Sequence, residues 1–145
     1  MSAELPLKPQ ITVPIEVFFF DTDAGGVVHN VAYLRMVEVA RSKLAESLNW
    51  SLKEMQDEGK GCPVVVRTEI DYLIPAKLGD VLEIHAEITE MQRIRFYIRF
   101  TIRRKSDNVV ISKVNQVMAT LNLTTGRPLA LREDWVEQWP DLCPR

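Results

Sequence analysis

Residues 93–104, RIRFYIRFTIRR, alternate apolar and polar side chains along almost their whole length. A period of two predicts a β-strand with one buried and one exposed face. The stretch 80–91, DVLEIHAEITEM, alternates in the same way, and only a short connection separates the two. Strands joined by such short turns pair antiparallel. The second half of the chain therefore predicts an antiparallel sheet that is apolar on one face.

Three further segments are rich in β-branched and aromatic residues and are predicted as strands: 11–20, 62–74 and 109–123. The three phenylalanines at 18–20 are expected to end the first strand in the core. From Asn30 to residue 48, apolar side chains recur at steps of three and four, which indicates an α-helix. Its predicted apolar face consists of Val31, Leu34, Val37, Ala40, Leu44 and Leu48. A second short helix is predicted at 51–58, with Ser51 as its cap and Glu54 completing a capping box.

The predicted order is one strand, one long helix and then four strands in a meander. Only one long helix is available to cover the apolar face of the sheet. We therefore expect an α+β fold in which a long antiparallel sheet wraps around one central helix. A chain of 145 residues, 46% of them hydrophobic, suffices for one core. Residues 1–10 are expected to form a flexible arm, and the domain 11–145 is expected to end in a polar tail.

Composition argues against several classes of function. The formal net charge is −2 and the basic residues are dispersed, so no nucleic-acid partner is expected. The longest apolar runs are too short to span a bilayer, so no membrane role is expected. Cys62 and Cys143 are far apart and lack metal-ligand spacing, which is typical of reduced thiols in a cytoplasmic protein without a metal.

The connection between the first strand and the helix carries unusual residues. Its sequence, FFFDTDAGGVVHN at 18–30, places two carboxylates and two glycines between a strand and a helix. Asp21 and Asp23 could be ordinary turn and capping residues, which aspartate before glycine suits well. Alternatively, one of the carboxylates could perform chemistry at the helix start. The pattern alone leaves both interpretations open.

Residues 17–41, VFFFDTDAGGVVHNVAYLRMVEVAR, closely resemble the acyl-CoA thioesterases of the 4-hydroxybenzoyl-CoA thioesterase and YbgC-like group. The matching positions are Asp21, Asp23, Gly26, Val28 and Tyr33. A second block at 71–84, DYLIPAKLGDVLEI, resembles the family's strand, Pro-Ala-x-x-Gly-Asp and following strand. The resemblance extends over about residues 11–130. It implies the hotdog fold and hydrolysis of an acyl- or aroyl-CoA.

The same resemblance assigns site residues by position. Asp23 matches the catalytic carboxylate, which serves as nucleophile or general base, and Asp21 is then structural. Asn30 matches the position whose backbone N–H points at the thioester oxygen, and its side chain is expected to cap the helix. Many relatives have Tyr-His where this chain has His29 and Asn30, so His29 is a candidate for a cap or a catalytic group. Substrate-binding roles are expected for Gly25, Gly26, Val28 and Tyr33, with the glycines allowing close backbone approach.

The resemblance also implies partners. Acyl-CoA is the expected substrate, coenzyme A being part of it, and no separate cofactor is expected. A homodimer is expected, and a tetramer built from two dimers. Two alternatives stay open: a hydratase or dehydratase that uses Asp23 and His29 on a hydroxyacyl-CoA, and a non-catalytic protein that binds acyl-CoA. The nature of the acyl group is open as well.

Two smaller points concern charged residues. Glu38 and Arg41 are three positions apart on the helix, so a salt bridge is the expected relation and a substrate contact the alternative. The arginines of 93–104 could bind phosphates of coenzyme A, although alternating charge on the outer face of a strand is ordinary.

Overall fold

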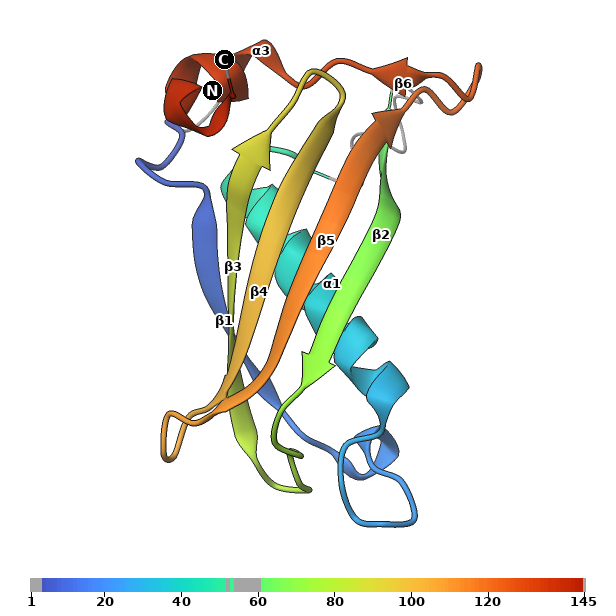
Figure 1. The fold of residues 1–145 in the computed structure, drawn as a ribbon, viewed down its shortest axis with the longest axis vertical. Coiled ribbons are helices and arrows are strands. Elements are labelled where there is room, and N and C mark those ends of the chain that lie inside the picture. Colours follow the sequence, from blue (N-terminus) through green and yellow to red (C-terminus); the bar gives the residue numbers. More distant parts are fainter. Residues whose placement is uncertain (1–3, 52, 54–60, 145) are drawn as a thin grey trace.

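The computed structural model describes residues 4–51, 53 and 61–144. A six-stranded antiparallel sheet lies against one long helix, α1 (Asn30–Ser47) (Figure 1). The strands are β1 (Gln10–Glu16), β2 (Cys62–Tyr72), β3 (Val81–Met91), β4 (Arg95–Arg104), β5 (Val110–Leu121) and β6 (Pro128–Leu129). Shorter helices are η1 (Phe19–Asp21), α3 (Glu133–Gln138) and η2 (Pro140–Leu142). The predicted α+β class is confirmed.

The strand order is β1-β3-β4-β5-β2, with β6 paired to β5. The strands β3, β4 and β5 form the expected meander, but β2 pairs with β5 and not with β3, so the predicted four-stranded meander is wrong at this point. Residues 73–80 do not make a tight hairpin. They cross the end of the sheet at which α1 begins, where Ala76 donates its amide to the hydroxyl of Tyr33 and accepts from the amide of Val28.

Strand β4 has the alternation that the sequence predicts. Phe96, Ile98, Phe100 and Ile102 are buried beneath α1, while the arginines at 95 and 99 are exposed on the outer face. The core therefore lies between the inner face of the sheet and α1. Within the described part of the chain, no helix is both long and apolar enough to cross a membrane.

The first strand is shorter than predicted. It ends at Glu16, and Phe18, Phe19 and Phe20 are 48%, 80% and 69% exposed. The chain turns out of the sheet because the amide of Asp21 donates to the carbonyl of Phe18, and that of Thr22 to the carbonyl of Phe19. The prediction that these phenylalanines end a buried strand is wrong, since backbone hydrogen bonds turn them outward.

Helix α1 occupies almost the predicted range, but its buried face differs at the first turn. The buried residues are Ala32, Tyr33, Met36, Val37, Ala40, Leu44 and Ala45. Val31 and Leu34, which the pattern places inside, are 60% and 41% exposed. Tyr33 takes the inward position because its hydroxyl is bound by the backbone of the 73–80 segment. The predicted short helix at 51–58 falls mostly on residues that the structure does not describe.

The end of the chain is not a polar tail. Trp135 and Trp139 are 2% and 4% exposed and belong to the core, so that expectation is wrong. The indole N–H of Trp139 lies 3.1 Å from the carbonyl oxygen of Pro6 and 3.2 Å from that of Leu7. These bonds also fix part of the N-terminal arm. Two tryptophans four residues apart place both rings on one side of the short helix α3.

Candidate active site

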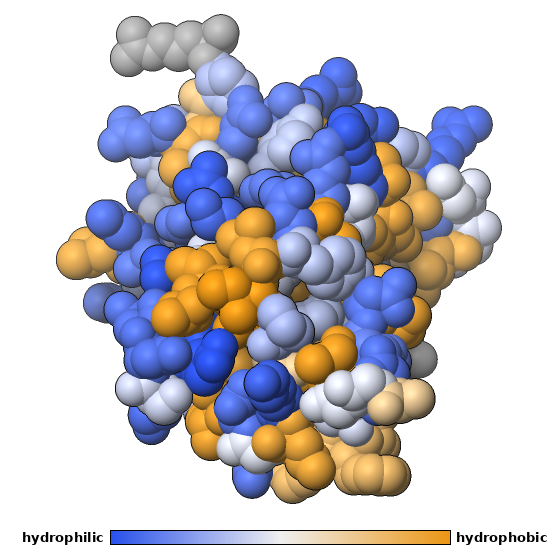
Figure 2. Space-filling view, turned by 60° about the horizontal axis from the view of Figure 1, so that its bottom comes forward, coloured by the Kyte–Doolittle hydropathy of each residue, from blue (hydrophilic) through white to orange (hydrophobic). Residues whose placement is uncertain are grey.

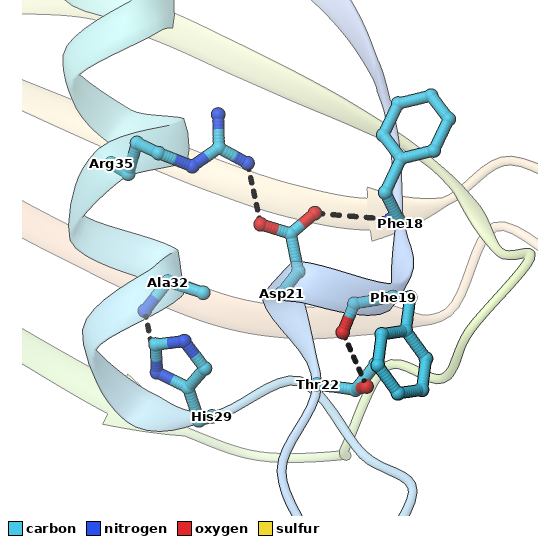
Figure 3. Close-up of polar contacts among 7 residues, drawn as sticks. All are labelled: Phe18, Phe19, Asp21, Thr22, His29, Ala32 and Arg35. Atoms are coloured by element: carbon cyan, nitrogen blue, oxygen red, sulfur yellow. Dashed lines mark hydrogen bonds and ion pairs between the residues drawn. The ribbon is translucent and has the colours of Figure 1, made fainter.

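Asp21 is a structural residue at the end of η1. Its side chain is 1% exposed, and one carboxylate oxygen accepts from Arg35 Nη2 at 2.6 Å (Figure 3). The other oxygen accepts the amide N–H of Phe18 at 3.0 Å. Its carbonyl accepts the amide of His29 at 2.9 Å. Asp21 thus joins the turn that follows β1 to α1, and both of its carboxylate oxygens are bonded.

Asp23 lies two residues further on and is exposed. Its Oδ1 accepts the amide of Gly25 at 2.8 Å, and its carbonyl accepts the amide of Gly26 at 3.0 Å. Gly26 has φ +77°, a conformation that glycine adopts without strain. The second carboxylate oxygen of Asp23 has no hydrogen-bond partner among the described residues. This loop therefore holds a carboxylate in place with one oxygen directed to solvent.

His29, and not Asn30, caps α1. The Nδ1 atom of His29 accepts the amide of Ala32 at 3.2 Å (Figure 3). Asn30 is the first helical residue, so the prediction that its side chain is the cap is wrong by one position. The amide N–H groups of Asn30 and Val31 have no acceptor in the part of the chain described, as expected for the first turn of a helix. They are free to bind an oxygen atom.

A shallow depression of about 240 Å³ opens at the start of α1, and we call it the helix-start depression. Its lining residues are Val28, Asn30, Tyr33, Tyr72, Leu73, Ile74 and Pro75. The hydroxyl of Tyr72 donates to the carbonyl of Asn30 at 3.2 Å, and the hydroxyl of Tyr33 accepts from Ala76 at 3.1 Å. Burial raises the pKa of Tyr33 above its ordinary value, so this hydroxyl stays protonated at neutral pH.

The structure brings only part of the predicted set together. Val28, Asn30 and Tyr33 line the same depression, whereas Asp23, Gly25 and Gly26 lie in the loop that leads into it and do not line it. The loop is tied to the second sequence block, since Val27 forms a bridge with Lys77 and Val28 donates to Ala76 at 2.8 Å. The two stretches of the sequence that resemble the thioesterase family thus form one unit.

The segment 72–75, which contains the end of β2, is a part of the depression that the sequence does not predict. Tyr72 and the residues at 73–75 form one side of the helix-start depression. The second block of the sequence, DYLIPAKLGD, includes these residues and resembles the family pattern, which could have indicated their role. Its side chains face the depression because the segment crosses the end of the sheet and does not turn back as a hairpin.

The other charged residues have ordinary partners. Arg41 Nη2 lies 3.6 Å from Glu38 Oε1, which confirms the expected salt bridge. Arg99 lies 3.8 Å from Glu87 on the outer face of the sheet. Within the described ranges, no group of three His, Cys, Asp or Glu side chains is placed to hold a metal ion.

Comparison with known proteins gives a consistent result. The model of the thioesterase superfamily matches residues 25–111. An acyl-CoA thioesterase YbgC from Haemophilus influenzae is 32% identical over 83% of this chain and 88% of its own length. A 1,4-dihydroxy-2-naphthoyl-CoA hydrolase from Synechococcus elongatus is 29% identical over 82% of this chain and 89% of its own.

A solved structure agrees with the sequence comparisons. A 1,4-dihydroxy-2-naphthoyl-CoA thioesterase from Synechocystis superposes with a TM-score of 0.83 at 25% identity, covering 92% of this chain and 97% of that protein. The two proteins therefore share their fold over nearly the whole length, including the start of α1 and the strands around this helix. This chain belongs to the thioesterase superfamily: it is a thioester hydrolase with the hotdog fold.

Proposed function

We propose that the protein is an acyl-CoA thioesterase whose chemistry occurs at the start of α1. One observation carries the proposal: the first turn of α1 presents two amide N–H groups that have no acceptor among the described residues, next to a loop that holds the exposed carboxylate of Asp23. The N-terminus of a helix carries a partial positive charge, which suits the negative oxygen that develops when a thioester is attacked. A depression with apolar walls adjoins the same turn.

Hydrolysis proceeds by addition of an oxygen to the thioester carbon. The carbonyl oxygen becomes negative and accepts from the N–H of Asn30, and the carbon–sulfur bond then breaks. The coenzyme A thiolate takes a proton and the acid is released. Asp23 either attacks the carbonyl carbon itself, giving an anhydride that water opens, or removes a proton from the attacking water. Coenzyme A is part of the substrate, and the reaction needs no further cofactor.

His29 contributes as a cap in this scheme. Its Nδ1 atom is bound to the amide of Ala32, which fixes the first turn of α1 and thereby the direction of the free N–H groups. A hydratase mechanism would instead use His29 as an acid or base together with Asp23. The capping bond disfavours that use, because it occupies one of the two ring nitrogens.

The acyl group is bound in the helix-start depression, with Val28, Tyr33 and Tyr72 at its wall. The named relatives act on acyl-CoA and on 1,4-dihydroxy-2-naphthoyl-CoA, so both aliphatic and aromatic acyl groups are candidates here. Gly25 and Gly26 keep the loop backbone close to the thioester, because neither has a Cβ to separate the two.

The protein functions as a homodimer, joined along β2, and two dimers form a tetramer. Strand β2 lies at the edge of the sheet and exposes Val65 and Val66, which are 44% and 46% exposed. An exposed apolar edge strand is a liability that pairing with a second copy removes. Figure 2 shows hydrophobic side chains gathered on the end of the molecule where α1 begins, a kind of surface that marks an interface.

The free cysteines of the protein fit a location in the cytoplasm.

Release of free thiol from a panel of acyl-CoAs tests the proposal. The panel contains aliphatic acyl groups of several lengths, a benzoyl group and 1,4-dihydroxy-2-naphthoyl-CoA, and Asp23→Asn is measured beside the native protein. We expect turnover of at least one member, reduced about 10²–10⁴-fold in the variant because a positioned base or nucleophile is lost. Turnover of the variant within threefold of the native rate would reject the role of Asp23. Binding of acyl-CoA without any turnover would favour the non-catalytic alternative.

A further inference from the structure

A second cavity lies at the other end of α1. It has a volume of about 330 Å³ and is enclosed by the second half of α1, the first residues of β2, the inner face of β4 and β5, and α3; we call it the α3 cavity. Among the described residues, it shares no lining residue with the helix-start depression. Arg41, in its wall, is eleven positions after Asn30 on the helix, which corresponds to about 16 Å along the helix axis. The cavity is thus separate from the candidate active site of the same chain.

Three aromatic rings form much of its wall. The ring centroid of Trp50 lies 5.0 Å from that of Trp135 and 6.1 Å from that of Phe96, and the rings of Phe96 and Trp135 are 5.7 Å apart. Aliphatic side chains of α1 and the sheet form much of the remaining lining, to which α1 adds the polar side chains of Glu38, Arg41 and Ser42. A space of this size with such walls is within the range of small-ligand sites and suits an apolar body such as a medium-length alkyl chain or an aromatic ring.

Two charged residues of the described chain line this cavity, Arg41 and Glu38, and Arg41 is the cation. Its side chain is only 20% exposed, and burial lowers its pKa because the charged form loses hydration. Its closest hydrogen bond is to a neutral group: Nη1 donates to Gln116 Oε1 at 2.7 Å, and Gln116 in turn donates to Thr68 at 3.1 Å. Within 4 Å, the only carboxylate of the described residues is Glu38, at 3.6 Å and itself 68% exposed. The guanidinium is therefore held rigidly while its charge is only weakly compensated.

The indole ring of Trp135 belongs to the wall of this cavity. Its Nε1 atom is fully buried and has no hydrogen-bond acceptor in the part of the chain described. A buried donor without a partner costs about 1–3 kcal/mol, so such groups are uncommon in native proteins. Because Nε1 has no accessible surface, the guanidinium of Arg41 is the donor group assigned to a ligand in this cavity.

We propose that the α3 cavity binds an apolar carboxylic acid, with its carboxylate on Arg41 and its body against the aromatic rings. A planar guanidinium matches a carboxylate in geometry and charge. A phosphate would bring nearly two charges to this single arginine. This assignment does not depend on the proposed reaction, although hydrolysis of an acyl thioester releases an acid of this class.

Tryptophan fluorescence measures this binding directly, because Trp50 and Trp135 line the cavity. The probe is octanoate, and octanamide is its neutral counterpart of nearly equal size. We expect octanoate to bind at least tenfold more tightly than octanamide. Arg41→Gln should lower the affinity for octanoate at least tenfold and leave the affinity for octanamide within threefold of the native value. Arg41→Lys keeps the charge and should retain most of the preference for octanoate over octanamide. Urea denaturation of each variant verifies that it is folded.

Asp23→Asn serves as the control that separates the two sites. It should abolish turnover and leave the affinity for octanoate unchanged, because the α3 cavity lies at the opposite end of α1. Three results would overturn the proposal: no binding of octanoate, equal affinities for octanoate and octanamide in the native protein, or a tenfold loss of octanoate affinity in Asp23→Asn. The last result would place the acid in the helix-start depression instead.

Discussion

Asp21 and Arg35 form an ion pair, 2.6 Å between Oδ1 and Nη2, that joins the end of the first strand to the first half of α1. The carboxylate is buried, whereas the guanidinium is about half exposed and lies over the ring of Phe20, 5.4 Å from its centroid. The two aspartates of one short motif therefore have different environments. Asp21 is enclosed and bonded on both oxygens, whereas Asp23 is exposed and one of its oxygens has no partner in the part of the chain that the structure describes.

The first prediction follows from this difference. Asp21→Asn should lower the free energy of unfolding by about 2 kcal/mol, because it removes charge-assisted hydrogen bonds from a buried site. Asp23→Asn is the matched control and should change stability by less than about 0.5 kcal/mol, as for other exposed positions. Urea denaturation followed by circular dichroism measures both. Equal destabilisation by the two variants would contradict the division of roles.

The neighbouring glycines give a second pair of variants. A Cβ at Gly25 would lie 3.2 Å from Asp23 Oδ1, so Gly25→Ala should displace the carboxylate. We expect turnover to fall about tenfold, since small misplacements of a reacting group are costly. Gly26→Ala meets no neighbouring atom but must adopt φ +77°, and should cost about 1–2 kcal/mol of stability. Initial rates and denaturation curves for both variants separate the effects; if Gly25→Ala kept full activity, the position of Asp23 would not be critical.

A third prediction concerns Tyr33. Burial raises its pKa, so the folded state favours the neutral phenol. Its contribution to stability is fully present below the pKa of an unfolded tyrosine, about 10, and is lost as pH rises from there through the folded value. Tyr33→Phe should remove from the alkaline titration at 295 nm an ionisation that occurs above the ordinary pKa of tyrosine. It should also cost about 1–3 kcal/mol because the amide of Ala76 loses its acceptor. An unchanged alkaline titration in the variant would refute this assignment.

The fourth prediction separates capping from catalysis at His29. His29→Ala should destabilise the protein by about 1 kcal/mol, the usual cost of a lost N-cap. His29→Asn can accept the amide of Ala32 in the same way and should restore that stability, with turnover within threefold of the native protein. Rates and unfolding free energies of both variants provide the measurement. A hundredfold loss of rate in a stable His29→Asn protein would assign His29 a catalytic role.

The sequence predicts well what depends on neighbouring residues. The alternation in 93–104 identifies the buried face of β4 correctly, because side chains of a strand alternate whatever the partner strand. The extent of α1 follows from its periodicity. The position of β2 does not follow, since a local pattern contains no information about which distant strand completes the sheet.

The errors near the site have specific physical causes. Phe19 is 80% exposed because the hydrogen bonds of η1 turn the chain, an arrangement that hydrophobicity alone does not predict. Asn30 and His29 are both acceptable caps, and the choice between them depends on where the loop enters the helix. The α3 cavity could not be predicted either, because Arg41, Trp50 and Trp135 are brought together only by the folded chain.

The strand order also has a consequence for the lifetime of the folded protein. The hairpins β3–β4 and β4–β5 close short loops, whereas the bond between Val28 and Ala76 joins segments on either side of β2 and closes a long one. Contacts that close short loops cost less entropy and are expected to be present in the folding transition state. Substitutions in these hairpins should then slow folding, and substitutions at the junction of Val28 and Ala76 should mainly speed unfolding. The unfolding rate, and with it the lifetime of the folded protein, would then depend on the contact between Val28 and Ala76, which also positions the residues of the candidate active site.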